Sequence, residues 1–407
     1  MGSWVTDTLV AVYPFTRQPD GNEVVIGRPD IAVYLVLPID AVELLDKLAA
    51  GWTVGQVQSF YQQKYGEVPD LDDLLDLLEH RGFVSSLAAD GLTETTRLQQ
   101  EKLFHSGRYH FANFPRSLAQ KFFSRPMLIS SGVLMAVALL AVWQTPTILP
   151  NWDAFFFTEN WALMSLLLML AGLVKVFLHE MAHLVAAKAV GVSSRLGISH
   201  RLWILVAETD MTGIWGVPRN QRYLPLLAGP LLDGVCAAIF ILILFAQYHG
   251  WLELPLLGLK LTKAILLTYL LGILWQCYFF VRTDFYYVIA NFLRCKSLMR
   301  DTEVWLRNQM ARILPRIRKI DQSHISAREM RVIRIYALVW LIGRVVAFSS
   351  LIFIGVPVIW NYLGLILGNL RHGAKFNSLD VLIAGFMFVP EMMGFWLWII
   401  SGQKSKR

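Results

Sequence analysis

Three polar residues with a spacing suited to metal chemistry lie inside a long apolar stretch. His179, Glu180 and His183 form the pattern HExxH within the apolar run 161–192. On an α-helix, residues i and i+4 share one face, so both histidines can offer a ring nitrogen to a single Zn²⁺ ion. Glu180 is rotated by about 100° from His179, so it can act as a general base on a water without binding the ion. The pattern predicts zinc-dependent hydrolysis, at a membrane depth where ionisable groups are costly and mark functional sites.

The composition is that of a polytopic membrane protein. Hydrophobic residues make up 55% of the 407 residues and charged residues only 16%, and the mean hydropathy is +0.48. These values are too apolar for an ordinary soluble protein of this length. The net charge of +7 is concentrated in particular loops, which favours membrane topology and lipid headgroups over nucleic acid. The three cysteines have no CxxC spacing, so we expect neither a disulfide framework nor a cysteine zinc site.

The chain is expected to have three parts. Residues 1–90 have the composition of a soluble domain, residues 91–125 form a linker or interfacial segment, and residues 126–407 form the membrane domain. In the first part, two β-prone runs at 24–26 and 31–37 flank a turn sequence and predict a hairpin, which three amphipathic helical patterns follow. The predicted fold class is therefore mainly α, a polytopic helical bundle with a small N-terminal α+β domain.

Six apolar runs each reach the length of about 20 residues that a bilayer requires. They lie near residues 127–147, 162–190, 223–247, 261–289, 335–366 and 379–401. The positive-inside rule places the basic segments before the first span, between the second and third, and between the fourth and fifth in the cytoplasm. Arg371 and Lys375 disagree mildly, because this arrangement places their loop outside. We expect an integral protein of a bacterial cytoplasmic membrane, with both termini cytoplasmic.

A catalytic zinc ion needs a third protein ligand and an open position for water. Asp284 lies ten residues before Arg294, where the fourth span would meet the cytoplasm, at a depth that matches His179 on the second span. Asp233 lies eleven residues after Arg222 on the third span, so depth alone does not exclude it. From the residues alone, both carboxylates remain candidates.

The segment from about residue 160 to residue 300 resembles the site-2-protease family of intramembrane zinc metalloproteases. The resemblance rests on HEMAH, on the polar and β-prone stretch LGISHRLWILVAETDMTGIWGV (residues 196–217), on AGPLLDG and on TDFYYVIANFL. It implies that His179, His183 and Asp284 bind zinc, that Glu180 is the catalytic base, and that Asp233 supports a ligand or the substrate. Two positions depart from the family: Phe285 stands where a Gly is usual, and Asp233 stands where relatives often carry Asn.

Residues 20–90, with PIDAVELLDKLAAGWTVGQV and DLLDLLEHRGFV, resemble the PqqD-like winged-helix domains that bind leader segments of ribosomally made peptides. A docking or regulatory winged helix without a peptide ligand remains an equal alternative, because function does not follow from fold. DNA binding is disfavoured, since the region is rich in Asp and Glu. Together the two resemblances imply hydrolysis of a membrane-associated or ribosomally made peptide precursor.

Two other functions compete with proteolysis. One is a membrane receptor or immunity protein that keeps the metal site but binds a peptide without cutting it. The other is a transporter, in which Lys175, Arg344 and Glu391 would join the aspartates in an ion path. We interpret Lys175 as a snorkelling or ion-paired residue, predict an intramembrane ion pair between Arg344 and Glu391, and expect His200 to be an interfacial residue rather than a ligand.

Overall fold

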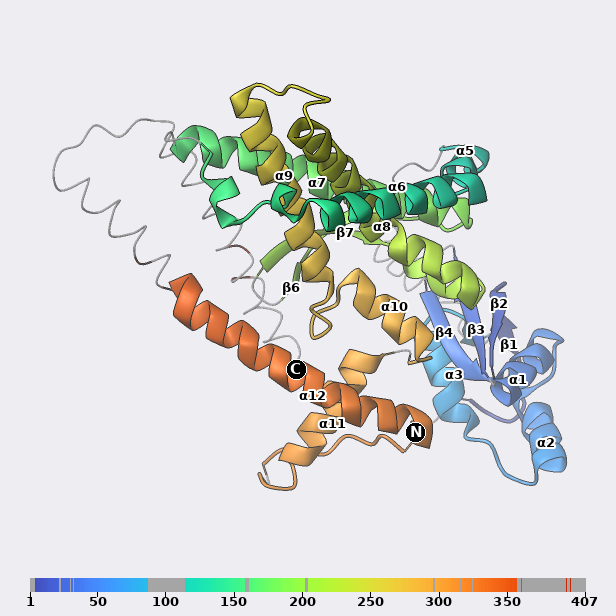
Figure 1. Cartoon of the computed structure of the whole chain (residues 1–407). Coiled ribbons are helices and arrows are strands. Elements are labelled where there is room, and N and C mark those ends of the chain that lie inside the picture. Colours follow the sequence, from blue (N-terminus) through green and yellow to red (C-terminus); the bar gives the residue numbers. More distant parts are fainter. Residues whose placement is uncertain are drawn as a thin grey trace, which may run out of the picture. The chain divides into compact units, whose positions relative to one another are not determined.

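Figure 1 shows the computed structural model of the chain, which is mainly helical. It describes residues 4–21, 23–29, 31, 33–86, 114–157, 161–201, 204–295, 297–314, 316–323, 325–356, 360, 393 and 396. The chain divides into two compact units. The first contains Met1–Gln120, Ala187–Leu196 and Thr209–Arg222, and the second contains Lys121–Ala186, Gly197–Glu208 and Tyr223–Arg407.

The first unit contains a three-stranded antiparallel meander. Its strands are β2 (Thr16–Asp20), β3 (Glu23–Arg28) and β4 (Val33–Pro38), paired in that order. The hairpin predicted from residues 24–26 and 31–37 is formed by β3 and β4, with Val25 opposite Val36. A second pair joins β1 (Val10–Val12) to β5 (Val84–Ser86) and brings both ends of the domain together.

Three helices follow the meander and bury the apolar faces that the sequence indicated. They are α1 (Ile39–Ala49), α2 (Val54–Tyr65) and α3 (Leu71–His80). The Thr53 side chain begins α2 with a capping box, and Asp70 caps α3, which satisfies amides that the first helical turn leaves unpaired. A hydrogen bond from Tyr61 to Asp40 links α2 to α1 at 2.8 Å and raises the pKa of Tyr61 to about 12.

A segment much later in the sequence completes the first unit. The short helix η3 (Thr212–Gly216) contacts β2, β3 and β4. At Gly216 the Tyr34 ring lies so close that an added Cβ would stand 2.7 Å from its Cε1. Arg222, whose side chain is only 3% exposed, pairs with Asp20 at 3.0 Å. It also donates hydrogen bonds to the backbone carbonyls of Trp215 and Val217.

We expect Asp20→Ala to destabilise the first unit by about 2 kcal/mol, because it leaves the buried Arg222 guanidinium without its carboxylate. The loss of stability stays below that caused by a fully uncompensated buried charge, because two carbonyl groups still accept hydrogen bonds from Arg222. Asp46→Ala is the matched control: its pair with Arg17 is 46% and 41% exposed, so its loss should cost less than about 1 kcal/mol. Urea-dependent proteolysis of the full-length chain in detergent compares the two. Equal effects would contradict the assigned role of Asp20.

Five helical segments of the described part are long and apolar enough to cross a membrane. They contain α5 (Arg116–Phe122) joined to α6 (Arg125–Gln144), α7 (Trp161–Ala189), α8 (Arg219–Tyr248), α9 (Leu256–Gln276) and α12 (Ala327–Ser350). Large apolar side chains such as Leu139 and Trp143 on α6 face outward. Such a surface suits lipid, whereas a soluble monomer rarely exposes one. The chain is therefore a membrane protein built mainly from helices. Of the predicted span at 379–401, the structure describes only residues 393 and 396.

The prediction of one continuous fourth span near 261–289 is wrong. Helix α9 ends at Gln276, a short non-helical stretch follows, and a separate helix α10 (Asp284–Phe292) begins at Asp284. Thr283 causes the new start, because its hydroxyl accepts a hydrogen bond from the amide of Tyr286 at 3.3 Å and donates one to the carbonyl of Gln276 at 2.9 Å. Asp284 therefore stands at a helix N-terminus and not in the middle of a span.

The β-prone stretch after α7 folds as a hairpin of β6 (Arg195–Arg201) and β7 (Ile204–Asp210), paired as a two-stranded sheet. Asp210 closes its base by pairing with Arg195 at 2.9 Å and by accepting two hydrogen bonds from Thr212. Burial raises the pKa of Asp210, but these partners outweigh it and lower the pKa overall. Their stabilising contribution is thus complete above the ordinary carboxyl pKa and is lost as the pH falls through the lowered value.

Near the end of the described chain, α11 (Leu298–Met310) packs against α12 (Figure 1). Arg344 of α12 lies 3.6 Å from the Glu303 carboxylate of α11. Glu391, Arg371 and Lys375 lie outside the described residues, so the predicted pair between Arg344 and Glu391 stays a prediction.

Candidate metal centre

Two histidines and one aspartate converge in the second unit. His179 Nε2 lies 3.2 Å from His183 Nε2 and 3.1 Å from Asp284 Oδ2, and His183 Nε2 lies 3.4 Å from the same oxygen. Four-coordinate ions held at about 2.0–2.1 Å separate their ligand atoms by about 3.3–3.4 Å in tetrahedral geometry. The three atoms therefore have the spacing that one small metal ion requires, and the group could hold such an ion.

The two histidines lie together because both are on one face of helix α7. Residues 179 and 183 are one turn apart, and their rings meet edge to face with centroids 4.9 Å apart. His183 is 2% exposed, so its polar ring needs partners inside the protein. Glu180, the next residue after His179, is also buried at 8% exposure. The role of Glu180 as a general base stays a prediction.

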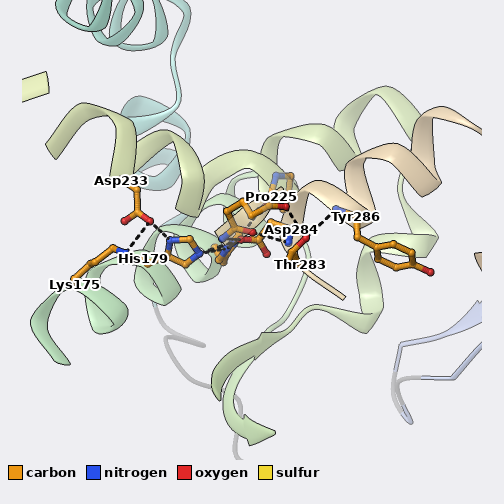
Figure 2. Close-up of polar contacts among 9 residues, drawn as sticks. Lys175, His179, Pro225, Asp233, Thr283, Asp284 and Tyr286 are labelled. Carbon is orange, nitrogen blue, oxygen red and sulfur yellow. Dashed lines mark hydrogen bonds and ion pairs between the residues drawn. The ribbon is translucent and has the colours of Figure 1, made fainter. Parts of the chain in front are cut away.

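The second nitrogen of each histidine is fixed by helix α8. His179 Nδ1 lies 3.0 Å from Asp233 Oδ2 (Figure 2). His183 Nδ1 lies 2.6 Å from the carbonyl oxygen of Pro225. When each Nδ1 carries the proton, it donates a hydrogen bond to its oxygen partner. The unprotonated Nε2 of each ring then faces the place where the two histidines and Asp284 converge. Metal-bound histidines usually have such a carboxylate or carbonyl partner. Asp233 therefore lies behind His179 and not among the three converging atoms.

Gln276, the last residue of α9, orients Asp284. Its side-chain nitrogen donates to Asp284 Oδ2 at 3.0 Å, and its side-chain oxygen accepts from the backbone amide of Asp284 at 3.0 Å. This paired contact determines which carboxylate oxygen faces the histidines. The break between α9 and α10 makes it possible, because it folds residue 284 back toward residue 276.

Gly229 provides the space in which the histidine nitrogens meet. A Cβ added to Gly229 would lie 2.5 Å from His179 Nε2 and still closer to His183 Nε2. Real Cβ atoms do not approach other heavy atoms so closely. Pro230, the next residue, lacks a backbone N–H and weakens the helix at this point. The Gly-Pro pair thus brings α8 close to the site while leaving room for ligand atoms.

Lys175 forms an ion pair, one of the two structural roles expected for it. Its Nζ lies 3.8 Å from Asp233 Oδ2 and donates to the carbonyl oxygen of Thr268 at 3.2 Å. Gly272 on α9 makes room for it, since a Cβ there would collide with the ammonium group. Figure 2 shows Asp233 between Lys175 and His179. The pair compensates a buried carboxylate that would otherwise be costly in this setting.

The structure brings together the predicted residues His179, His183 and Asp284, with Asp233 in contact with His179. No family model, curated protein or solved structure matches the chain. The donor set, two imidazoles and one carboxylate, is used by catalytic zinc sites and by non-haem iron sites.

Sequence reasoning did not identify Gln276, Pro225 or Gly229 as parts of the site. Gly229 lies within the AGPLLDG motif, so its small size and the proline after it were a usable signal. Thr283 before Asp284 was a second signal, since Ser and Thr favour helix starts. Nothing in the local sequence marks Gln276 or the carbonyl of Pro225, because their roles arise from contacts between helices.

Proposed function

We propose that this protein is an intramembrane zinc metalloprotease that hydrolyses a membrane-associated or ribosomally made peptide precursor. The observation that carries the proposal is the convergence of His179, His183 and Asp284 within 3.4 Å of one another beside the buried Glu180. A carboxylate immediately after the first histidine is what a hydrolytic zinc site needs. This carboxylate favours a hydrolytic zinc site over an iron oxygenase site, because a glutamate after the first histidine has no comparable role in an iron oxygenase site.

Each residue of the site would have its own role in the reaction. Glu180 takes a proton from the attacking water and returns it to the leaving amine. Asp233 and the carbonyl of Pro225 hold both histidine rings in the tautomer that presents Nε2. A bound Zn²⁺ ion supplies Lewis acidity for the scissile carbonyl and lowers the pKa of water toward about 7.

Two further parts of the chain fit the handling of a peptide. Among the described residues the β6–β7 hairpin forms a sheet of two strands, to which an extended substrate can add as a further strand. The first unit, with its meander and three helices, fits a PqqD-like winged helix that binds the leader segment of the precursor. This assignment also agrees with the site-2-protease resemblance of residues 160–300.

Zinc content tests the proposal first. We expect about one zinc ion per wild-type chain purified in detergent, and near-complete loss in His183→Ala and in Asp284→Ala. Asp233→Ala should still bind zinc, but with an affinity about 10- to 100-fold lower, because Asp233 orients His179 without touching the ion. Elemental analysis and chelator competition measure both quantities. A well-folded wild type without zinc would reject the protease.

A further inference from the structure

A basic groove that shares no residue with the metal centre lies between α11, the loop after it and the first turns of α12. Its volume is about 540 Å³, within the range of about 300–1,000 Å³ typical of small-ligand sites. The charged residues that line it are Arg312, Lys319, Asp321 and Arg334. Trp305 and Met330 supply an apolar part of the wall.

The groove has an excess of positive charge. Three cationic side chains line it against one carboxylate, and Asp321 already accepts hydrogen bonds from the amide and hydroxyl of Ser323 at 3.0 and 2.8 Å. Among the residues that the structure describes, Arg312, Lys319 and Arg334 form no ion pair. Like charges gathered in a concave site attract anions, because they raise the local potential.

The wall of the groove is held in place by paired hydrogen bonds. The Asn308 side chain donates to the carbonyl of Ile320 at 2.8 Å and accepts from the amide of Ile320 at 2.9 Å. Gln322 donates to the carbonyl of Asp301 at 2.9 Å. These contacts tie the loop to α11, so the groove is largely formed before any ligand arrives, which lowers the entropic cost of binding.

The position of the groove along α12 relates it to the bilayer surface. Arg334 is the last charged residue of α12 before the uncharged stretch 335–343, which belongs to a candidate membrane span. Charged residues that flank a span lie at the level of the lipid headgroups, and tryptophan is enriched there. Arg334 and Trp305 therefore indicate that the groove opens where lipid phosphate groups are concentrated.

We propose that this groove binds the phosphate group of an anionic phospholipid. Planar guanidinium groups bind phosphate oxygens in pairs, and a lysine ammonium adds a mobile point charge. Basic pockets at the cytoplasmic ends of membrane helices are suited to anionic headgroups. The site is separate from the metal centre in its residues, so it would anchor and orient α11 and α12 whether or not the chain is a protease.

Native mass spectrometry of the full-length chain in detergent tests the proposal with phosphatidylglycerol and phosphatidylcholine as probes. We expect tighter binding of phosphatidylglycerol, and at least a tenfold loss, about 1.4 kcal/mol, in the triple variant Arg312→Gln, Lys319→Gln, Arg334→Gln. The matched control is Arg300→Gln, Arg307→Gln, Arg318→Gln, which removes the same charge from exposed positions that do not line the groove. The control should bind as the wild type does.

Three outcomes would overturn the proposal. The first is equal binding of the two lipids by the wild type, and the second is an equal loss in both triple variants, which would indicate a diffuse charge effect. The third is displacement of the lipid by millimolar inorganic phosphate with the same dependence on the groove residues, which would make free phosphate the ligand. The single variant Arg312→Gln repeats the comparison with a smaller perturbation, and circular dichroism verifies that every variant remains folded.

Discussion

Glu180→Gln is expected to abolish peptide-bond hydrolysis while leaving about one zinc ion per chain. The amide keeps the size of the side chain but cannot accept a proton from water, so the rate should fall by about 10² to 10⁴-fold or more. Metal binding should persist because Glu180 is not among the three converging ligands. The measurement is cleavage of a panel of fluorescent single-span peptides by the protein in proteoliposomes.

Glu253→Gln is the matched control for this experiment. Glu253 lies in an exposed loop between α8 and α9, so the same chemical change there should leave cleavage unaltered. Cleavage of a peptide at the wild-type rate by Glu180→Gln would refute the assignment of Glu180 as the base. Zinc binding without cleavage by the wild type would instead support the receptor.

Gly229→Ala is expected to eliminate metal binding although it adds only one methyl group. The new Cβ would stand 2.5 Å from His179 Nε2 and closer still to His183 Nε2, so the ligand nitrogens must move apart. A zinc site tolerates a variation of only about 0.2 Å in its metal–ligand distances. The shift of the two histidine nitrogens that relieves the contact with the new Cβ exceeds this tolerance. We expect zinc per chain to fall from about one to near zero, as measured by elemental analysis.

Gly172→Ala supplies the comparison for Gly229→Ala. Gly172 lies on α7, the helix that carries both histidines, and a Cβ there meets nothing within 4 Å. Because alanine is the better helix former by about 1 kcal/mol, this variant should keep its zinc and fold at least as well as the wild type. If both alanine variants retained zinc equally, Gly229 would have no special role at the site.

The histidine pair was predictable because it depends only on helical periodicity. HExxH within an apolar run is sufficient to place His179 and His183 on one face of α7, and the structure places their nitrogens 3.2 Å apart. The hairpin of β3 and β4 was equally local, as was the capping of α2 by Thr53. Such features depend only on residues that are close in the sequence, so each of them can be predicted from its own segment.

Asp284 shows where local sequence patterns were not sufficient. Residues 261–289 are apolar enough to indicate one span, yet hydrogen bonds from Thr283 and Gln276 break the helix and redirect Asp284. Hydropathy reports the environment of a segment but not its continuity, because polar groups inside a membrane protein can bond to one another. Asp284 lies close to both histidines, as expected, but it does so at the start of the separate helix α10 and not within one continuous span.

The separation of the converging residues along the chain has a consequence for biosynthesis. His179 meets Asp233 across 54 residues and Asp284 across 105 residues, and helix α10 follows the four earlier membrane helices of the described part. A nascent chain can bring His179 and Asp233 together before residue 284 has been synthesised, but it cannot complete the group of His179, His183 and Asp284. Under the proposed function, the emerging polypeptide would therefore have no protease activity toward neighbouring membrane proteins until α10 has folded against the histidines.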